Sequence, residues 1–172
     1  MPKKGAKRTK DAEESGSFVS MPGDAITSLR SELSNLLGER LASGVLFRFG
    51  YRCGEGLAER LSSKETGSDN ATEILPKIWQ RTGLGTISQI KEISEDEMEV
   101  EIAGSTEALA LGSAEEPICD CTRGYLAGVA NWLSKKRFYC VEESCLSQGQ
   151  KTCTFRLVVF PHKVYVSKKE SE

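Results

Sequence analysis

The chain has 172 residues, 38% of them hydrophobic, and its 23 basic and 25 acidic side chains give a formal charge of −2. This length is enough for one soluble domain with a sizeable core, so the six cysteines are not required as covalent staples. The near-balanced charge argues against a domain dedicated to a nucleic-acid backbone, because such domains usually carry a net basic face.

The sequence contains neither a run of about 18 apolar residues nor an N-terminal apolar stretch of the kind found in secretory signals. We therefore expect a cytoplasmic protein that does not enter a membrane. In a reducing compartment, clustered cysteines are better interpreted as metal ligands, redox groups or small buried hydrophobes than as disulfides.

The two ends of the chain are polar. Residues 1–17 hold five cations and three anions among few apolar residues, which predicts a disordered basic tail. A solubilising role is the simpler interpretation of this tail, with weak contact to RNA or an acidic partner as the alternative. The folded domain is expected over 18–166, and 167–172 form a second polar tail.

Two helices are predicted in the first third of the domain. Apolar residues recur at steps of three and four from Asp24, which indicates a helix with Asp24 as its N-cap and Gly38 as its stop. A second stripe, from Leu41 to Leu61, is interrupted by Gly44, Gly50, Gly54 and Gly56. Since each glycine costs about 1 kcal/mol relative to alanine in a helix, we expect another helix or a ligand to approach closely there.

The rest of the chain alternates hairpins and helices. A short apolar helical face surrounds Ile74 and Trp79, strands at 86–93 and 97–102 form a hairpin, and a helix follows over 118–133. Strands at 137–142 and 152–160 form a second hairpin. The predicted class is α+β, with N-terminal helices packed on an antiparallel sheet and a C-terminal helix and hairpin.

Five of the six cysteines lie between 119 and 153. Cys119 falls in the first turn of a helix, where the dipole favours a thiolate. Cys145 and Cys153 flank the last hairpin turn, and Glu142 ends its first strand. Zinc accepts such thiolate and carboxylate ligands in a tetrahedral site. From spacing alone, a metal site and a set of buried inert cysteines stay open as equal alternatives, ahead of a disulfide.

These residues match a known pattern. The stretch Pro117-Ile118-Cys119, then Gly124-Tyr125 and Gly128, then Cys140-Val141-Glu142-x-x-Cys145 with Gly149, Cys153 and Phe155, resembles the 4-vinyl reductase domain family. The resemblance is strong over 117–155 and extends more loosely back to 47–54.

The resemblance implies a fold like that of the small subunits of the TRAPP vesicle-tethering complex, usually dimeric. It also implies a zinc ion held by Cys119, Glu142, Cys145 and Cys153, which would be structural because four protein ligands leave no open position. Such a zinc would pin the helix start to the final hairpin. Cys53, Cys121 and Cys140 have no ligand role in the family pattern, and replacement of a ligand by Cys121 or Cys140 stays open.

Sensor members of this family receive an aromatic or other apolar molecule between the helices and the sheet. The candidate lining is aromatic, with ordinary core packing as the alternative: Phe47, Phe49, Tyr51, Trp79, Tyr125, Trp132 and Phe138. Aromatic sensors of the family bond a phenolic hydroxyl through a histidine and a tryptophan. The only histidine here, His162, lies after the last predicted strand, so phenol-type recognition is not expected.

The leading hypothesis is a zinc-containing binding domain for a hydrophobic small molecule, acting as a sensor, carrier or accessory subunit. The alternatives are a subunit of a reductase acting on a vinyl or tetrapyrrole-type substrate, and a ligand-free interaction or tethering module. An enzyme is the weaker hypothesis, because no dinucleotide fingerprint or nucleophile–base arrangement occurs. A homodimer is predicted through the first helices, from Leu33, Leu36, Leu37, Leu41 and Val45, with Gly44 permitting close approach.

Overall fold

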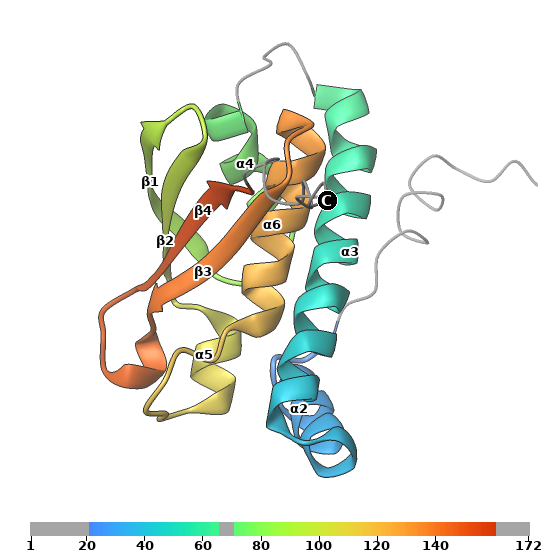
Figure 1. Cartoon of the computed structure of the whole chain (residues 1–172), viewed down its shortest axis with the longest axis vertical. Helices are drawn as coiled ribbons and strands as arrows, with labels where there is room; N and C mark the ends of the chain where they lie inside the picture. Colours follow the sequence, from blue (N-terminus) through green and yellow to red (C-terminus); the bar gives the residue numbers. More distant parts are fainter. Residues whose placement is uncertain (1–20, 66–70, 161–172) are drawn as a thin grey trace, which may run out of the picture.

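A computed structural model describes residues 21–65 and 71–160. The predicted tails at 1–17 and 167–172 and His162 lie outside the described residues. Among the helices of the described ranges, none is long and apolar enough to cross a membrane. The elements are α2 Asp24–Leu37, α3 Glu39–Glu65, α4 Ala71–Trp79, β1 Thr86–Ser94, β2 Glu97–Ala103, α5 Thr106–Leu111, α6 Asp120–Ser134, β3 Phe138–Ser144, the short 3-10 helix η1 Leu146–Gln148, and β4 Cys153–Val159 (Figure 1).

The four strands form one antiparallel sheet in the order β1-β2-β4-β3. Both predicted hairpins are present, and the pairing of β2 with β4 joins them. On β2 the side chains of Met98, Val100 and Ile102 are buried, and the glutamates between them are half-buried on the opposite face. This alternation places the core between the sheet and the helices, so the predicted α+β class is confirmed.

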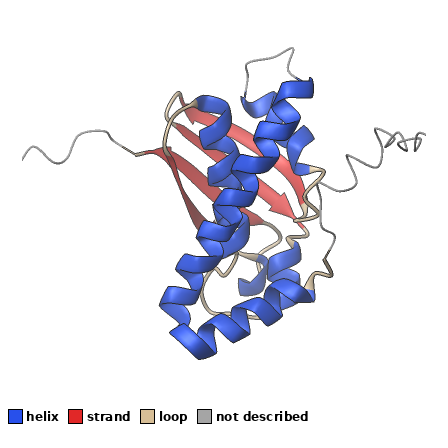
Figure 2. Ribbon diagram, turned by 90° about the vertical axis from the view of Figure 1, so that its right-hand side faces the viewer, coloured by secondary structure: helices blue, strands red, loops and turns tan. Residues whose placement is uncertain are grey.

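Helices α3 and α6 lie side by side across one face of the sheet, while α2 and α5 lie together beyond one end of it (Figures 1 and 2). The start of α6 therefore lies where the sheet, α5 and α2 come close to one another. This meeting point holds the cysteine cluster described below.

Four glycines let α3 and α6 touch along their backbones. A Cβ atom on Gly50 would lie 2.0 Å from the carbonyl oxygen of Cys121, and one on Gly124 would lie 2.0 Å from that of Phe47. Gly54 and Gly128 repeat this contact one turn further on, at 2.3 and 2.1 Å. The predicted close approach is confirmed for these positions, and its cause is the facing helix rather than a ligand. Gly44 and Gly56 have nothing within 4 Å of such a Cβ, so the expected approach is absent there within the described chain.

Helix α2 packs loosely on the domain. It spans the predicted residues, but Asp24 is its first helical residue and not its cap. Gly23 occupies the N-cap position and forms no side-chain cap hydrogen bond. No residue of α2 is buried. Several large apolar side chains of α2 and α3 are exposed instead: Leu29, Leu36, Leu37, Leu41, Val45 and Phe49.

Candidate metal centre

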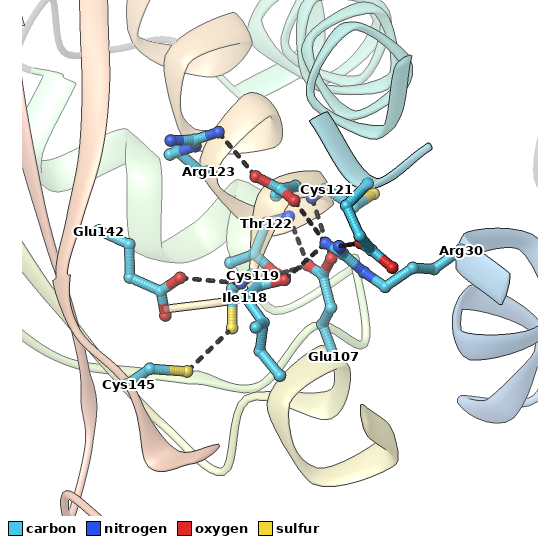
Figure 3. Close-up of polar contacts among 11 residues, drawn as sticks. Arg30, Glu107, Ile118, Cys119, Cys121, Thr122, Arg123, Glu142 and Cys145 are labelled. Carbon is cyan, nitrogen blue, oxygen red and sulfur yellow. Dashed lines mark hydrogen bonds and ion pairs between the residues drawn. The ribbon is translucent and has the colours of Figure 1, made fainter. Parts of the chain in front are cut away.

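Four buried side chains from separate parts of the C-terminal half converge at one end of the sheet. Cys119 is the N-cap of α6, Glu142 belongs to β3, Cys145 precedes η1 and Cys153 begins β4. Their ligand atoms all lie within 4.8 Å of one another, and the four residues can hold a metal ion. The β3–β4 hairpin supplies three of them and the start of α6 adds the fourth (Figure 3).

The spacing of the sulfur atoms fits a tetrahedral cation. The Sγ atom of Cys119 lies 3.6 Å from that of Cys145 and 3.8 Å from that of Cys153, and the last two are 3.6 Å apart. A tetrahedron with zinc–sulfur bonds of about 2.3 Å has edges of about 3.8 Å. Disulfide sulfurs would lie about 2.0 Å apart, and all six cysteines are free.

Glu142 has one carboxylate oxygen held and one unused. Its Oε2 atom accepts a hydrogen bond of 2.8 Å from the backbone N–H of Cys119. Its Oε1 atom is buried and has no hydrogen-bond partner. Because a buried oxygen without a partner is costly, this atom suits a monodentate ligand to the same cation as the three sulfurs.

Nearby polar groups orient the sulfur ligands. The hydroxyl of Ser147 donates to Sγ of Cys145 over 2.9 Å, and the backbone N–H of Leu146 donates to Sγ of Cys153 over 3.3 Å. Such donors to a thiolate hold its direction and lower its pKa. The turn that carries η1 therefore supplies both ligands and their supporting hydrogen bonds.

The four groups perturb one another strongly. Hydrogen bonds with Cys119 and Cys153 hold the pKa of the Cys145 thiol well below its usual range, while the bond with Cys145 raises the pKa of Cys119. Burial, followed by the hydrogen bond with Cys145, raises the pKa of Glu142 to about 8. By themselves the four groups thus concentrate negative charge on one sulfur. A divalent cation is the partner that lets all three thiols and the carboxyl ionise together.

Glu107 caps the helix that carries Cys119. This carboxylate, from α5, is fully buried and accepts hydrogen bonds from the N–H groups of Cys121 and Thr122 at 3.0 and 2.8 Å and from the Thr122 hydroxyl at 2.9 Å. Burial raises the pKa of Glu107, and the bonds from Thr122 and Cys121 oppose that shift. Sequence reasoning missed this residue, because a cap supplied from another helix leaves no local pattern.

Arg30 of α2 contacts the same helix start. Its Nη2 atom donates to the carbonyl oxygen of Ile118 over 2.9 Å and forms a close ion pair with Asp120. Arg123 binds the other oxygen of Asp120 at 2.7 Å. Arg30 and Asp120 are ninety residues apart in sequence, so no motif could have linked them.

The remaining cysteines stay outside the cluster. Cys121 and Cys140 are buried but do not belong to the group of ligand atoms that lie together. Burial raises the pKa of Cys140 and of the half-buried Cys53, as expected for thiols in apolar surroundings. The structure therefore gives no support to Cys121 or Cys140 as a substitute ligand.

The seven aromatic residues predicted to line a pocket are spread over different surroundings. Trp79 is buried and packs edge-on against Tyr125 with ring centroids 5.9 Å apart, whereas Phe49 is 43% exposed. The Tyr51 hydroxyl accepts a hydrogen bond of 3.0 Å from Asn131. Because the backbones of α3 and α6 are in contact at Gly50, Gly54, Gly124 and Gly128, these glycines do not open a space between the two helices. The cavity argued from them is therefore wrong at that place.

A hollow of about 560 Å³ lies at the other end of the sheet. Met98 lines it near the start of β2, whereas Ile102 near the end of β2 pairs with the metal-ligand position Cys153. Phe138 is the one predicted lining residue that faces this hollow. The full lining consists of Thr72, Glu92, Ile93, Ser94, Glu95, Met98, Ser134, Lys136 and Phe138.

The fold is that of a group of small α+β domains seen in solved structures. A trafficking protein particle complex subunit 3 from Naegleria fowleri, covalently bound to palmitic acid, is 16% identical, with a TM-score of 0.59 over 80% of this chain and 95% of that one. At this identity the likeness concerns the fold alone, and it confirms the predicted TRAPP-like architecture.

Residues 98–159 match the model of the 4-vinyl reductase domain, and this part of the chain belongs to that domain family. Residues 17–96 match the family described as activator of aromatic catabolism. A vinyl-4-reductase family protein from Methanocaldococcus jannaschii is 26% identical, with a TM-score of 0.53 over 67% of this chain and 68% of that one. None of the curated proteins matches the sequence.

The phenol-responsive sensory domain of the transcription activator PoxR, solved with phenol, is also similar. It is 25% identical to this chain, with a TM-score of 0.70 over 83% of this chain and 76% of that one. The likeness thus covers the helices and the sheet together and extends beyond the 4-vinyl reductase part.

Proposed function

We propose that this chain is a zinc-containing binding domain for a hydrophobic small molecule, working as a sensor, carrier or accessory subunit. The observation that carries the proposal is the likeness to the phenol-responsive sensory domain over 83% of the chain. The matches to the 4-vinyl reductase domain and to the activators of aromatic catabolism support the same class of protein.

The metal in this proposal is zinc, held by Cys119, Glu142, Cys145 and Cys153. Three sulfurs at tetrahedral spacing and one free carboxylate oxygen form a donor set that zinc accepts. When bound, the ion would neutralise part of the charge of the ligands and cross-link the start of α6 to the β3–β4 hairpin. With four protein ligands there is no position for a reacting water, so we assign it a structural role.

The ligand site in this proposal is the hollow beside Phe138. Its volume of about 560 Å³ lies within the range of small-molecule pockets, about 300 to 1,000 Å³. Ile93, Met98 and Phe138 give it an apolar wall, and serine, glutamate and lysine side chains border that wall. Since no histidine lines it, we expect burial of apolar surface to drive binding and larger apolar compounds to bind better than phenol.

The proposal includes a homodimer. Exposed large apolar side chains on α2 and α3, which include Leu36 at 77% and Leu41 at 61% exposure, are of the kind found at interfaces. Gly44 leaves open space above α3, and a second copy of the chain related by a two-fold axis would cover both helices. Light scattering that gives the mass of a monomer at micromolar concentration would contradict this part.

Native mass spectrometry of the purified protein tests the proposal most directly, because one spectrum reports the metal, the subunit count and any retained molecule. We expect one zinc per chain and a dimer. A calorimetric titration with long-chain and polycyclic compounds and with phenol then tests the ligand class.

The matched variants for this titration are Ile93→Asp, which changes an exposed residue that lines the hollow, and Leu109→Asp, which changes an exposed leucine on α5. We expect Ile93→Asp to weaken binding at least tenfold and Leu109→Asp to leave it unchanged. Equal binding by both variants would move the ligand site away from the hollow.

Two other functions have an observation in their favour. The vinyl-4-reductase family neighbour favours a reductase subunit, and a bound cofactor that absorbs above 300 nm would support this. The glycine-filled contact between α3 and α6 and the TRAPP-like fold favour an interaction module. Failure of every apolar compound to bind would place the interaction module first.

A further inference from the structure

Arg30 contacts the chain on both sides of a proposed zinc ligand. Its guanidinium donates to the carbonyl of Ile118, the residue before Cys119, and pairs with the carboxylate of Asp120, the residue after it. Figure 3 shows the Arg30 side chain reaching from α2 to the start of α6. One side chain of α2 therefore binds both neighbours of Cys119.

This contact is shielded from solvent. The side chains of Arg30 and Asp120 are 13% and 11% exposed, and Arg123 holds the second oxygen of Asp120. Screening by water and salt is weak for such a pair, so it depends on the geometry of its partners more than a surface pair does. Arginine suits this position because its planar fork can donate to a carbonyl and a carboxylate together.

The rest of α2 has few other attachments. No residue of α2 is buried. Within the described residues, the side-chain hydrogen bonds of α2 to other elements come from Arg30, which also lies 3.7 Å from the exposed Glu39 of α3. The position of α2 thus depends on how residues 118–120 are held.

We propose that Arg30 couples the docking of α2 to the metal centre. The inference rests on the proposed function in that it needs a cation at Cys119. A cation fixes Cys119 and with it the Ile118 carbonyl and the Asp120 carboxylate, which form the receptor for the guanidinium. Loss of the cation loosens this receptor and releases α2. By linkage the effect is reciprocal, so a docked Arg30 tightens the metal site by the same factor.

The coupling gives the metal a role beyond stability. Helix α2 carries the exposed residues Leu29, Leu36 and Leu37. Metal occupancy therefore sets where these apolar side chains stand relative to those of α3, and so controls the surface proposed for a second copy of the chain.

The test uses the full chain with zinc alone as the probe. Hydrogen exchange of α2 peptides is measured with zinc bound and after chelation, for the wild type and for Arg30→Gln, Arg30→Lys and Arg52→Gln. Arg52 is an exposed arginine that pairs with Glu55 on its own helix and is the matched control. Zinc affinity of each variant is measured by competition with a chromophoric chelator.

We expect chelation to speed exchange in α2 and 118–122 while α4 and β1 stay protected. Arg30→Gln should speed exchange in α2 with zinc still bound and weaken zinc binding at least about fivefold. Arg30→Lys should lie between, and Arg52→Gln should match the wild type. Zinc affinity and α2 exchange that do not change in Arg30→Gln would overturn the coupling alone, whereas a wild type that binds no zinc would overturn the proposed metal centre as well.

Discussion

The two ends of the sheet are built for different tasks. At the end with the cysteine cluster, three elements meet through buried ligand atoms, capped N–H groups and shielded ion pairs. At the other end a hollow is bordered by exposed residues of β1 and the β1–β2 turn. A buried network of paired polar groups rigidifies its surroundings, whereas an open apolar wall leaves room for a ligand. The comparison shows how one small domain can hold its frame fixed while one end stays available for binding.

The largest expected effect comes from removing a ligand at the rigid end. Cys145→Ser should abolish tight zinc binding and lower the free energy of unfolding by several kcal/mol, because the ion joins segments that are distant in sequence. Elemental analysis and thermal melting measure both effects. Cys53→Ser, at a half-buried cysteine outside the cluster, is the control and should retain the metal. Unchanged melting of Cys145→Ser would show that the cluster is not a structural metal site.

The contact between α3 and α6, which runs from one end to the other, should be the next most sensitive feature. Gly50→Ala places a Cβ atom 2.0 Å from a backbone oxygen, so the helices must separate. We expect a loss of about 1–3 kcal/mol or more. Gly44→Ala on the same helix has open space and should stabilise the protein by up to about 1 kcal/mol. Urea unfolding gives both values, and the same sign for both would contradict the packing described.

The cap of α6 predicts a smaller loss at the rigid end. Glu107→Gln keeps the shape of the side chain but puts an NH₂ group where a carboxylate oxygen accepts hydrogen bonds. We expect a loss of about 1–3 kcal/mol in the free energy of unfolding. Glu116→Gln, at an exposed residue before α6, should have no effect. If both variants unfold at the same urea concentration, Glu107 does not secure the helix start.

The smallest effect is expected at the open end. Lys136 pairs with Asp96 at 2.7 Å on the exposed border of the hollow. Water and salt screen such a pair. Lys136→Gln should therefore leave the urea midpoint unchanged at low and high salt. A clear shift of the midpoint would mean that the two ends are less different than the structure indicates.

The local patterns of the sequence were sufficient for most of the secondary structure. The steps of three and four in α2 and the alternation in β2 predicted both elements, and in β2 also the buried face, because those periods follow from backbone geometry. Family resemblance, rather than spacing, singled out Cys119, Glu142, Cys145 and Cys153 from the six cysteines. The structure brings these four together, while their role as zinc ligands stays a prediction.

Only the tertiary structure decided what fills the space beside the glycines and what supports the cysteine cluster. A glycine in a helix indicates a close approach but not its partner, and the partner of Gly50 proved to be the backbone of α6. Arg30, Glu107 and Asp120 meet their partners across long separations in sequence. Their pairing depends on how helices and sheet pack, a global property that no local period encodes. For the same reason the hollow lies at β1 and β2 rather than between the two glycine-bearing helices.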